Sequence, residues 1–227
     1  MAMIELSMKE RPILLLGGGQ VAQDRLSRLV PEDPLVTVLA PCLTEPIKSW
    51  WREGALVWWQ ERLSLESASG RVEAWMESFG GQSDLTPLVI LATDDPVVNS
   101  HVGQLVRARG WLLSGPVERA DMAFANASYL GGLGVSLTTK PASPRLNALI
   151  RRDLEDRYQV LQDDPTILAE LAYLRDLLKE QVHTSKERRV FWRRYLDGEA
   201  LAQIRAGQWT CVKERLEDAI SSLGIES

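Results

Sequence analysis

A glycine-rich turn near the start of the sequence has the residue types and spacing to bind the phosphates of a dinucleotide. It follows the apolar run Pro12–Leu16 and opens a stretch with helical periodicity. In a G-x-G-x-x-A turn the first glycine permits the tight bend, the second lets the backbone approach a pyrophosphate, and the alanine keeps helix and strand close. Amides at the helix N-terminus add donors for the anion. A purely structural turn is the alternative. The predicted cofactor contacts are Gly17, Gly18, Gly19, Gln20, Val21 and Ala22.

The residue that usually selects between NAD and NADP is missing from its usual place. An acidic side chain at the end of the second strand normally binds the ribose hydroxyls of NAD. Here the run Leu35–Leu39 is followed by Ala40-Pro41-Cys42, with Glu45 a few residues later and no arginine to favour NADP. The residues alone leave the choice of nicotinamide open.

A second polar group follows the apolar run Leu88–Ala92. Thr93, Asp94 and Asp95 come where a buried parallel strand should end, and open α/β sheets bind ligands at the carboxyl ends of their strands. The alternative is that these residues cap the next helix, a role that Asp95 alone would fill. We expect Thr93 and Asp94 to line the cofactor site, with Asp94 also a candidate catalytic residue.

The elements that must position these groups alternate between strand and helix patterns. This alternation predicts an α/β fold with a Rossmann-like parallel sheet. After residue 115 the pattern changes to a hairpin around Gly131-Gly132, and from Ser143 onward, with Pro144 in the first turn, it is helical. The predicted strands are 12–16, 35–39, 55–59, 88–92 and 111–113, and the predicted helices between them are 20–29, 46–53, 72–79 and 97–109.

The composition narrows the class of partner. The 227 residues carry a net charge of −5, which argues against nucleic acid, because phosphate binding needs a concentrated basic surface. No apolar run approaches the roughly 20 residues that span a bilayer, and no signal-peptide pattern is present. Two scattered cysteines, Cys42 and Cys211, and two histidines, His101 and His183, make neither a disulfide framework nor a zinc pattern. We expect a cytoplasmic protein with no metal site, nucleic-acid partner or membrane partner.

Two further groups of residues, the tryptophan pairs and a basic run near the C-terminus, each have two possible interpretations. The tryptophan pairs 50–51 and 58–59 would either form an aromatic surface for a flat ligand or pack in the core. The basic run Lys186–Arg189, with Arg193 and Arg194, would either engage carboxylates of a ligand or form a solvated helix face.

Four motif segments occur in a fixed order over nearly the whole chain. They are Leu15–Ala22, Leu91–Asp95 with Val98-Asn99, Thr138–Pro144 with Leu146 and Leu154-Glu155, and Glu187–Trp192 with Leu201-Ala202. As an ordered set they resemble the precorrin-2 dehydrogenase/sirohydrochlorin ferrochelatase module of siroheme synthases. The segments correspond to its opening glycine fingerprint, its A-T-D-D…V-N signature, its S-S-G-G-x-S-P stretch and its E-R-R-x-F-W helix.

The resemblance implies a three-part chain and a reaction. Residues 1–114 would form the NAD-binding Rossmann domain, 115–144 a small mixed dimerisation region, and 145–227 a helical C-terminal domain. It further implies a homodimer that uses NAD to oxidise the tetrapyrrole precorrin-2 to sirohydrochlorin, with insertion of ferrous iron in many members. Substrate contacts are expected from Thr139, Lys140 and Ser143. Lys140 interrupts the family's small Ser/Gly loop, and the alternative interpretation of this residue is a solvated loop lysine.

One departure from the family pattern bears on catalysis. The family carries an aspartate just after its fifth strand, where this chain has Gly115 or Pro116. Glu118 and Asp121 are nearby carboxylates, and with Asp94 they are the candidate acid–base residues, because losing a hydride from carbon also requires a proton to leave. The alternatives are a non-catalytic tetrapyrrole carrier that lost this aspartate, and an unrelated Rossmann oxidoreductase.

Overall fold

The computed structural model describes residues 5–79, 84–124, 126–137 and 143–223. The chain divides into two compact units, Met1–Phe124 and Ala125–Ser227, which we call the N-terminal and C-terminal units. Among the described residues, no helix combines the length and the apolar character that crossing a membrane requires.

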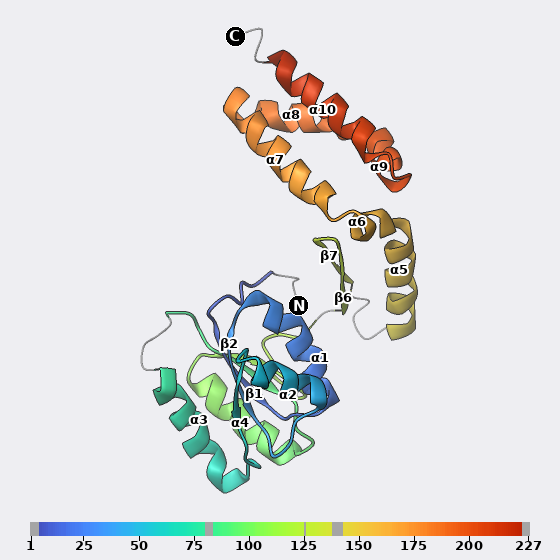
Figure 1. The fold of residues 1–227 in the computed structure, drawn as a ribbon. Coiled ribbons are helices and arrows are strands. Elements are labelled where there is room, and N and C mark those ends of the chain that lie inside the picture. The colour runs from blue at the N-terminus through green and yellow to red at the C-terminus, as the bar shows by residue number, and fades with distance from the viewer. Residues whose placement is uncertain (1–4, 80–83, 125, 138–142, 224–227) are drawn as a thin grey trace. The chain divides into compact units, whose positions relative to one another are not determined.

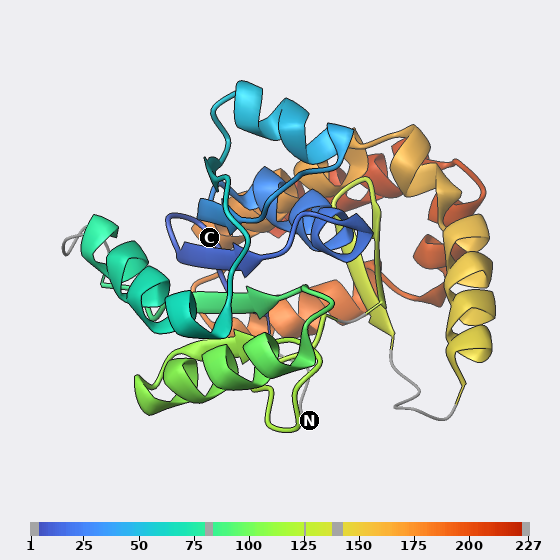
Figure 2. The ribbon, with the colours of Figure 1, turned by 90° about the horizontal axis from the view of Figure 1, so that it is seen from below.

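The N-terminal unit is a five-stranded parallel sheet flanked by helices (Figures 1 and 2). The strand order is β3-β2-β1-β4-β5, the arrangement expected of a Rossmann sheet, so the predicted fold class is confirmed. The strands are β1 (Pro12–Leu16), β2 (Leu35–Leu39), β3 (Val57–Trp59), β4 (Leu88–Leu91) and β5 (Leu112–Ser114). The helices are α1 (Gln20–Leu29), α2 (Glu45–Arg52), α3 (Leu65–Phe79) and α4 (Pro96–Ala108), with a short 3-10 turn, η1 (Val30–Glu32), after α1.

The central strand β1 shows why the sheet forms. All five of its residues are buried, as a strand covered on both faces requires. Ile13 and Leu15 pack in the cluster with α1 and α2, whereas Leu14 and Leu16 pack in the cluster with α3 and α4. Figure 2 shows these helix pairs on opposite sides of the sheet. Because β1 pairs with both β2 and β4, the loops that follow these three strands meet at one edge.

Helix α3 begins at Leu65, earlier than the predicted start at residue 72. The Ser64 hydroxyl accepts a hydrogen bond from the Ser67 amide at 3.3 Å, and the Ser67 hydroxyl accepts one from the Ser64 amide at 3.0 Å. This reciprocal cap starts the helix, although small residues and Gly70 give its first turns little helical periodicity. Strand β3 is shorter than predicted, because Ala55 still donates to the Trp50 carbonyl at the end of α2.

The C-terminal unit contains an antiparallel hairpin followed by helices. The hairpin strands are β6 (Asn126–Leu130) and β7 (Leu133–Leu137), and the helices are α5 (Pro144–Arg157), α6 (Gln159–Asp163), α7 (Thr166–Gln181), α8 (Ser185–Tyr195), α9 (Gly198–Arg205) and α10 (Trp209–Leu223). Helices α7 and α10 are joined by Glu170, which accepts from Trp209 Nε1 at 2.5 Å and Lys213 Nζ at 2.8 Å. The predicted apolar stripe on α5 is present, but Leu146, Leu149 and Ile150 are exposed in the single chain.

One arginine of the basic run on α8 forms hydrogen bonds within the fold. Arg188 donates from Nη1 to the carbonyls of Val182 and His183, both at 2.7 Å, and so satisfies carbonyl groups at the end of α7. Lys186, Arg189 and Arg193 are exposed on the same helix. The structure therefore divides this run between a capping residue and solvated charge.

Candidate functional site

The glycine turn after β1 is enclosed by two neighbouring loops. Gly17 has φ of +112°, and a Cβ there would lie 2.3 Å from the Ala92 carbonyl oxygen in the loop after β4. A Cβ at Gly18 would lie 2.1 Å from the Cys42 carbonyl oxygen in the loop after β2. The first two glycines are therefore required by the fold itself, whether or not a ligand binds.

Gly19 differs from its neighbours because the space in front of it is open. A Cβ at Gly19 would meet no atom of the described structure within 4 Å. Gly19 is the N-cap of α1, with φ of −87°, and no side chain caps the helix amides. The first amides of α1 lack acceptors within the helix, and the helix begins at this open position. The turn therefore fits the pyrophosphate of a dinucleotide.

The other three residues of the turn divide between core and surface. Ala22 lies on the buried face of α1 and is fully buried, as close contact between helix and strand requires. Val21 is 55% exposed, and Gln20 is exposed with its amide donating to Asp24 at 3.0 Å. Gln20 and Val21 thus have side chains at the surface of the candidate site.

The two aspartates in the loop after β4, Asp94 and Asp95, have different surroundings. Asp95 Oδ1 accepts from the amides of Val97 at 2.9 Å and Val98 at 3.0 Å, so it caps α4 as its alternative interpretation predicted. Asp94 is exposed and forms no hydrogen bond or ion pair with any residue in the described ranges. Because a Cβ at Gly17 would lie closest to the Ala92 carbonyl, this loop adjoins the glycine turn.

Thr93 is fixed by a residue to which the sequence assigned no role. Its hydroxyl donates to Asn99 Oδ1 at 2.8 Å, and Asn99 Nδ2 donates back to the Thr93 carbonyl at 3.1 Å. Asn99 is only 2% exposed. The Val98-Asn99 motif could have revealed it, because a buried amide needs partners nearby. Asn99 therefore shapes the loop that presents Asp94.

The candidate carboxylates Glu118 and Asp121 lie in the segment after β5. This segment runs beside α4, away from the N-terminal end of that helix. A Cβ at Gly103 in α4 would meet Val117 at 3.7 Å, among other neighbours. Gly103 lies about two helical turns, or roughly 10 Å, from the start of α4. Glu118 comes next and is exposed, with no hydrogen bond or ion pair to another described residue. Asp121 Oδ2 accepts from the Leu113 amide in β5 at 3.0 Å. Of the three candidates, Asp94 stands in the loop that adjoins the glycine turn.

Asp121 therefore has a structural task that a substitution should expose. We expect Asp121→Ala to lower the free energy of unfolding by about 1–3 kcal/mol, because it removes the acceptor of a buried amide. Glu118→Ala is the matched control and should stay within about 0.5 kcal/mol of wild type. Urea unfolding monitored by tryptophan fluorescence measures both, and equal stability of the two variants would refute this role for Asp121.

The predicted substrate contacts are only partly covered by the structure. Thr139 and Lys140 lie outside the described residues. Ser143 accepts from the Leu146 amide at 3.1 Å and caps α5. Its role toward a substrate stays a prediction.

Trp50, Trp58 and Trp59 pack against the two core clusters, whereas Trp51 is 42% exposed. Trp58 Nε1 donates to the Ala40 carbonyl at 2.9 Å, and the ring of Trp51 stands edge-on to it at a centroid distance of 5.2 Å. Trp58 also packs against the core cluster beneath α1 and α2. It therefore fixes the loop after β2 beside the glycine turn.

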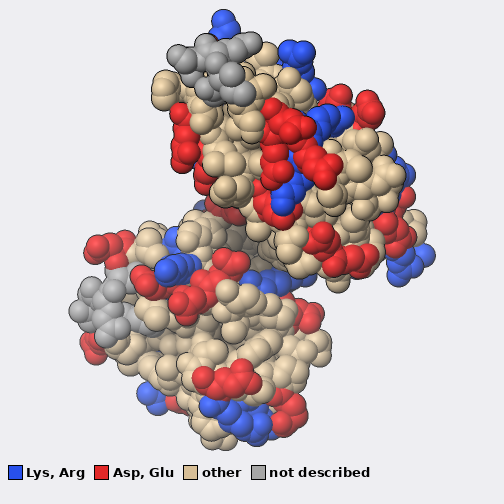
Figure 3. Space-filling view, turned by 45° about the horizontal axis from the view of Figure 1, so that its top comes forward, with Lys and Arg blue, Asp and Glu red and all other residues tan. Residues whose placement is uncertain are grey.

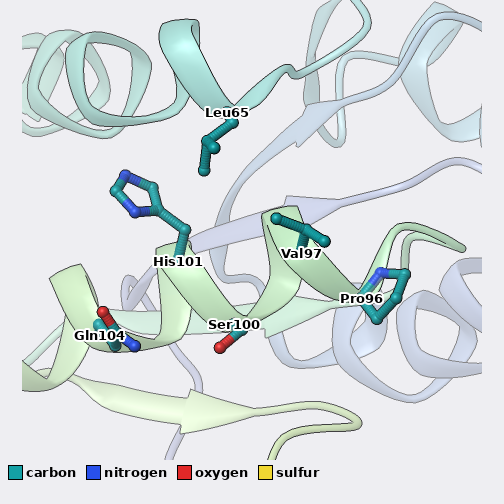
Figure 4. Close-up of a pocket in the computed structure, with 6 residues that line it drawn as sticks. All are labelled: Leu65, Pro96, Val97, Ser100, His101 and Gln104. Atoms are coloured by element: carbon teal, nitrogen blue, oxygen red, sulfur yellow. The ribbon is translucent and has the colours of Figure 1, made fainter.

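A groove of about 420 Å³ lies between α3 and α4 (Figure 4). Its lining contains no charged residue, so it suits a polycarboxylate ligand poorly. His101 Nε2 lies 3.2 Å from Ser69 Oγ, which gives this histidine a structural partner. The lining residues are Leu65, Pro96, Val97, Ser100, His101 and Gln104.

Charge is dispersed on the face of the molecule shown in Figure 3. Acidic and basic side chains alternate there, with no large basic area. Within the described residues, no group of three or more His, Cys, Asp or Glu side chains is placed to hold a metal ion.

Comparisons with known proteins agree with this geometry. Residues 4–124 match a family described as putative NAD(P)-binding, and residues 167–220 match the sirohaem synthase dimerisation region. Siroheme synthase 1 of Pectobacterium atrosepticum is 28% identical over 204 residues, which cover 88% of this chain and 39% of that protein. Siroheme synthase of Photorhabdus laumondii is 25% identical over 226 residues, 98% of this chain and 44% of that protein. The chain thus spans about two-fifths of the length of these curated relatives.

A solved structure shares the fold. The structure of SirC, a precorrin-2 dehydrogenase, matches with a TM-score of 0.69 at 20% identity and covers 96% of this chain and 100% of its own.

The Rossmann strand order and the open glycine turn define a protein that binds a nicotinamide dinucleotide. The NAD(P)-binding match covers more than half of the chain. The sirohaem synthase dimerisation match follows it along the chain, as in the family that the four motif segments resemble. The chain belongs to the siroheme synthase N-terminal module family.

Proposed function

We propose that this chain is an NAD-dependent precorrin-2 dehydrogenase that forms sirohydrochlorin. One observation carries the proposal: an open dinucleotide turn at Gly19 adjoins a loop with the unengaged carboxylate of Asp94, in a chain of this family. The names of its relatives, siroheme synthase and precorrin-2 dehydrogenase, indicate the substrate class.

Different residues bind the cofactor, position the adjoining loop and accept the proton. Bound NAD supplies the hydride acceptor. The turn Gly17–Ala22 and the first amides of α1 bind its pyrophosphate and hold it in one position. Thr93, fixed by Asn99, shapes the adjoining loop. Loss of two hydrogens from carbon is loss of a hydride and a proton, and Asp94 accepts the proton. Glu118 and Asp121 are the remaining candidates for that proton, with weaker support from their positions.

We further propose substrate contacts from the segment that contains Thr139, Lys140 and Ser143. A lysine there would pair with a carboxylate of the tetrapyrrole. Replacing Lys140 by Met should raise the KM for the tetrapyrrole with little effect on the Kd for NAD. Steady-state kinetics beside cofactor titration separate the two, and an unchanged KM would remove Lys140 from the substrate site.

The assembly that we propose is a homodimer in the cytoplasm. The dimerisation match at residues 167–220 and the exposed apolar face of α5 support it. We propose that the dimer draws on both the region 115–144 and the helical domain 145–227, with residues 1–114 as the NAD-binding domain. Insertion of ferrous iron into sirohydrochlorin is a second candidate activity, suggested by the family resemblance.

The main alternative is a tetrapyrrole carrier without catalysis. It is favoured by Gly115-Pro116, which stand where the family carries an aspartate. A Cβ at Gly115 would lie 2.6 Å from Leu91 Cβ, so a simple return to aspartate at this position would not fit without movement.

An anaerobic incubation with precorrin-2, with and without NAD, separates the two functions. A dehydrogenase gives the absorption spectrum of sirohydrochlorin only when NAD is present. Retention of unchanged tetrapyrrole on the protein in both samples would support the carrier and contradict the proposal.

A further inference from the structure

The loop between β2 and α2 is the part of the structure nearest to the middle of the glycine turn. The Thr44 amide donates to the Gly18 carbonyl at 3.0 Å, and the Cys42 carbonyl is the first atom that a Cβ at Gly18 would meet. In a Rossmann sheet the adenosine ribose lies beside the end of the second strand, next to the pyrophosphate turn. This loop therefore borders the ribose.

The loop has no acidic side chain at the usual ribose position. Ala40, which directly follows β2, is 1% exposed, and its carbonyl is used by Trp58 Nε1 at 2.9 Å. The first acidic residue after β2 is Glu45, the first residue of α2 and the neighbour of Thr44. Its side chain is 72% exposed. Glu45 is thus the first carboxylate available beyond the strand.

Glu45 also holds the cations of the same helix. Lys48 Nζ lies 2.5 Å from Glu45 Oε1, and Arg52 Nη1 lies 3.9 Å from Glu45 Oε2. The hydrogen bond from Lys48 lowers the pKa of Glu45, which keeps the carboxyl group ionised at neutral pH. A phosphate on the ribose 2′ oxygen would therefore approach a carboxylate whose neighbouring cations are already neutralised.

We propose that Glu45 is the residue that makes this site select NAD over NADP. The inference rests on the cofactor site in the proposed function. The negative charge of Glu45 repels a 2′-phosphate, and its contacts with Lys48 and Arg52 deny that phosphate its counterions. An unphosphorylated ribose meets no such repulsion and gains a hydrogen-bond acceptor.

The test is the ratio of the Kd values for NAD⁺ and NADP⁺, measured on the full chain by isothermal titration calorimetry. Glu45→Gln removes the charge with little change in shape. Glu53→Gln is the matched control, because it removes one exposed negative charge at the other end of α2. The double variant Glu45→Gln/Lys48→Gln also removes Lys48, the cation that loses its partner in Glu45→Gln.

Wild type and Glu53→Gln should bind NAD⁺ more tightly than NADP⁺. Glu45→Gln should improve NADP⁺ binding by about tenfold, with NAD⁺ affinity changed by less than about threefold. The double variant should lose the NADP⁺ gain. An unchanged ratio in Glu45→Gln, with NAD⁺ still bound, would overturn this inference alone. Failure of wild type to bind either cofactor would overturn the proposed function as well.

Discussion

Gly19→Asp should abolish NAD binding without lowering the stability of the fold. A Cβ at Gly19 would meet no described atom within 4 Å, and φ of −87° is ordinary for an aspartate. Aspartate is moreover a favoured N-cap residue, so it should hold or raise the stability of α1. Its carboxylate would occupy the space left for the pyrophosphate and repel it. We expect the Kd for NAD to rise at least about a hundredfold.

Gly17→Ala is the contrasting variant for this experiment. Its Cβ would lie 2.3 Å from the Ala92 carbonyl, and φ of +112° is strained for alanine. We expect the free energy of unfolding to fall by about 2–4 kcal/mol. Thermal unfolding and NAD titration of both variants should therefore show opposite profiles. Wild-type affinity for NAD in a folded Gly19→Asp protein would contradict the assignment of the turn.

Asp94→Asn should lower kcat for precorrin-2 oxidation by about 10²–10⁴-fold. The amide keeps the shape of the side chain but no longer accepts the departing proton. Because Asp94 forms no hydrogen bond or ion pair with the rest of the described structure, we expect the melting temperature to stay close to wild type. The Kd for NAD should also change little, because asparagine fills the same space at the edge of the cofactor site. A large loss of kcat with normal binding would identify a catalytic group.

Asp95→Asn provides the matched control for Asp94→Asn. It makes the same chemical change one residue along the chain, and asparagine also caps helices well, so α4 should keep its N-cap. Its kcat should remain near wild type. Full activity in Asp94→Asn, combined with loss of activity in Glu118→Gln, would transfer the acid–base role to Glu118.

The sequence predicted the central part of the N-terminal unit well, because its signals there are local. Five buried apolar residues in β1 end at three glycines, and the bounds of α1 and β2 agree with the prediction. The start of α3 was not predictable from periodicity, since its first turns are set by the reciprocal Ser64–Ser67 cap.

The roles of the carboxylates needed three-dimensional information. Asp95 was recognisable as a cap from its position before a helix, and the structure agrees. Asp121 gave no local signal, because its partner Leu113 is reached only when the segment after β5 turns back along that strand. The apolar stripe of α5 was visible in the sequence, whereas its exposure in the single chain was not.

The most direct test of the central claim is to follow NADH formation with precorrin-2 generated in situ, using wild type and Gly19→Asp. We expect wild type to form one NADH for each sirohydrochlorin and Gly19→Asp to form none. Binding of the tetrapyrrole by wild type without any NADH would contradict the account and identify the chain as a carrier.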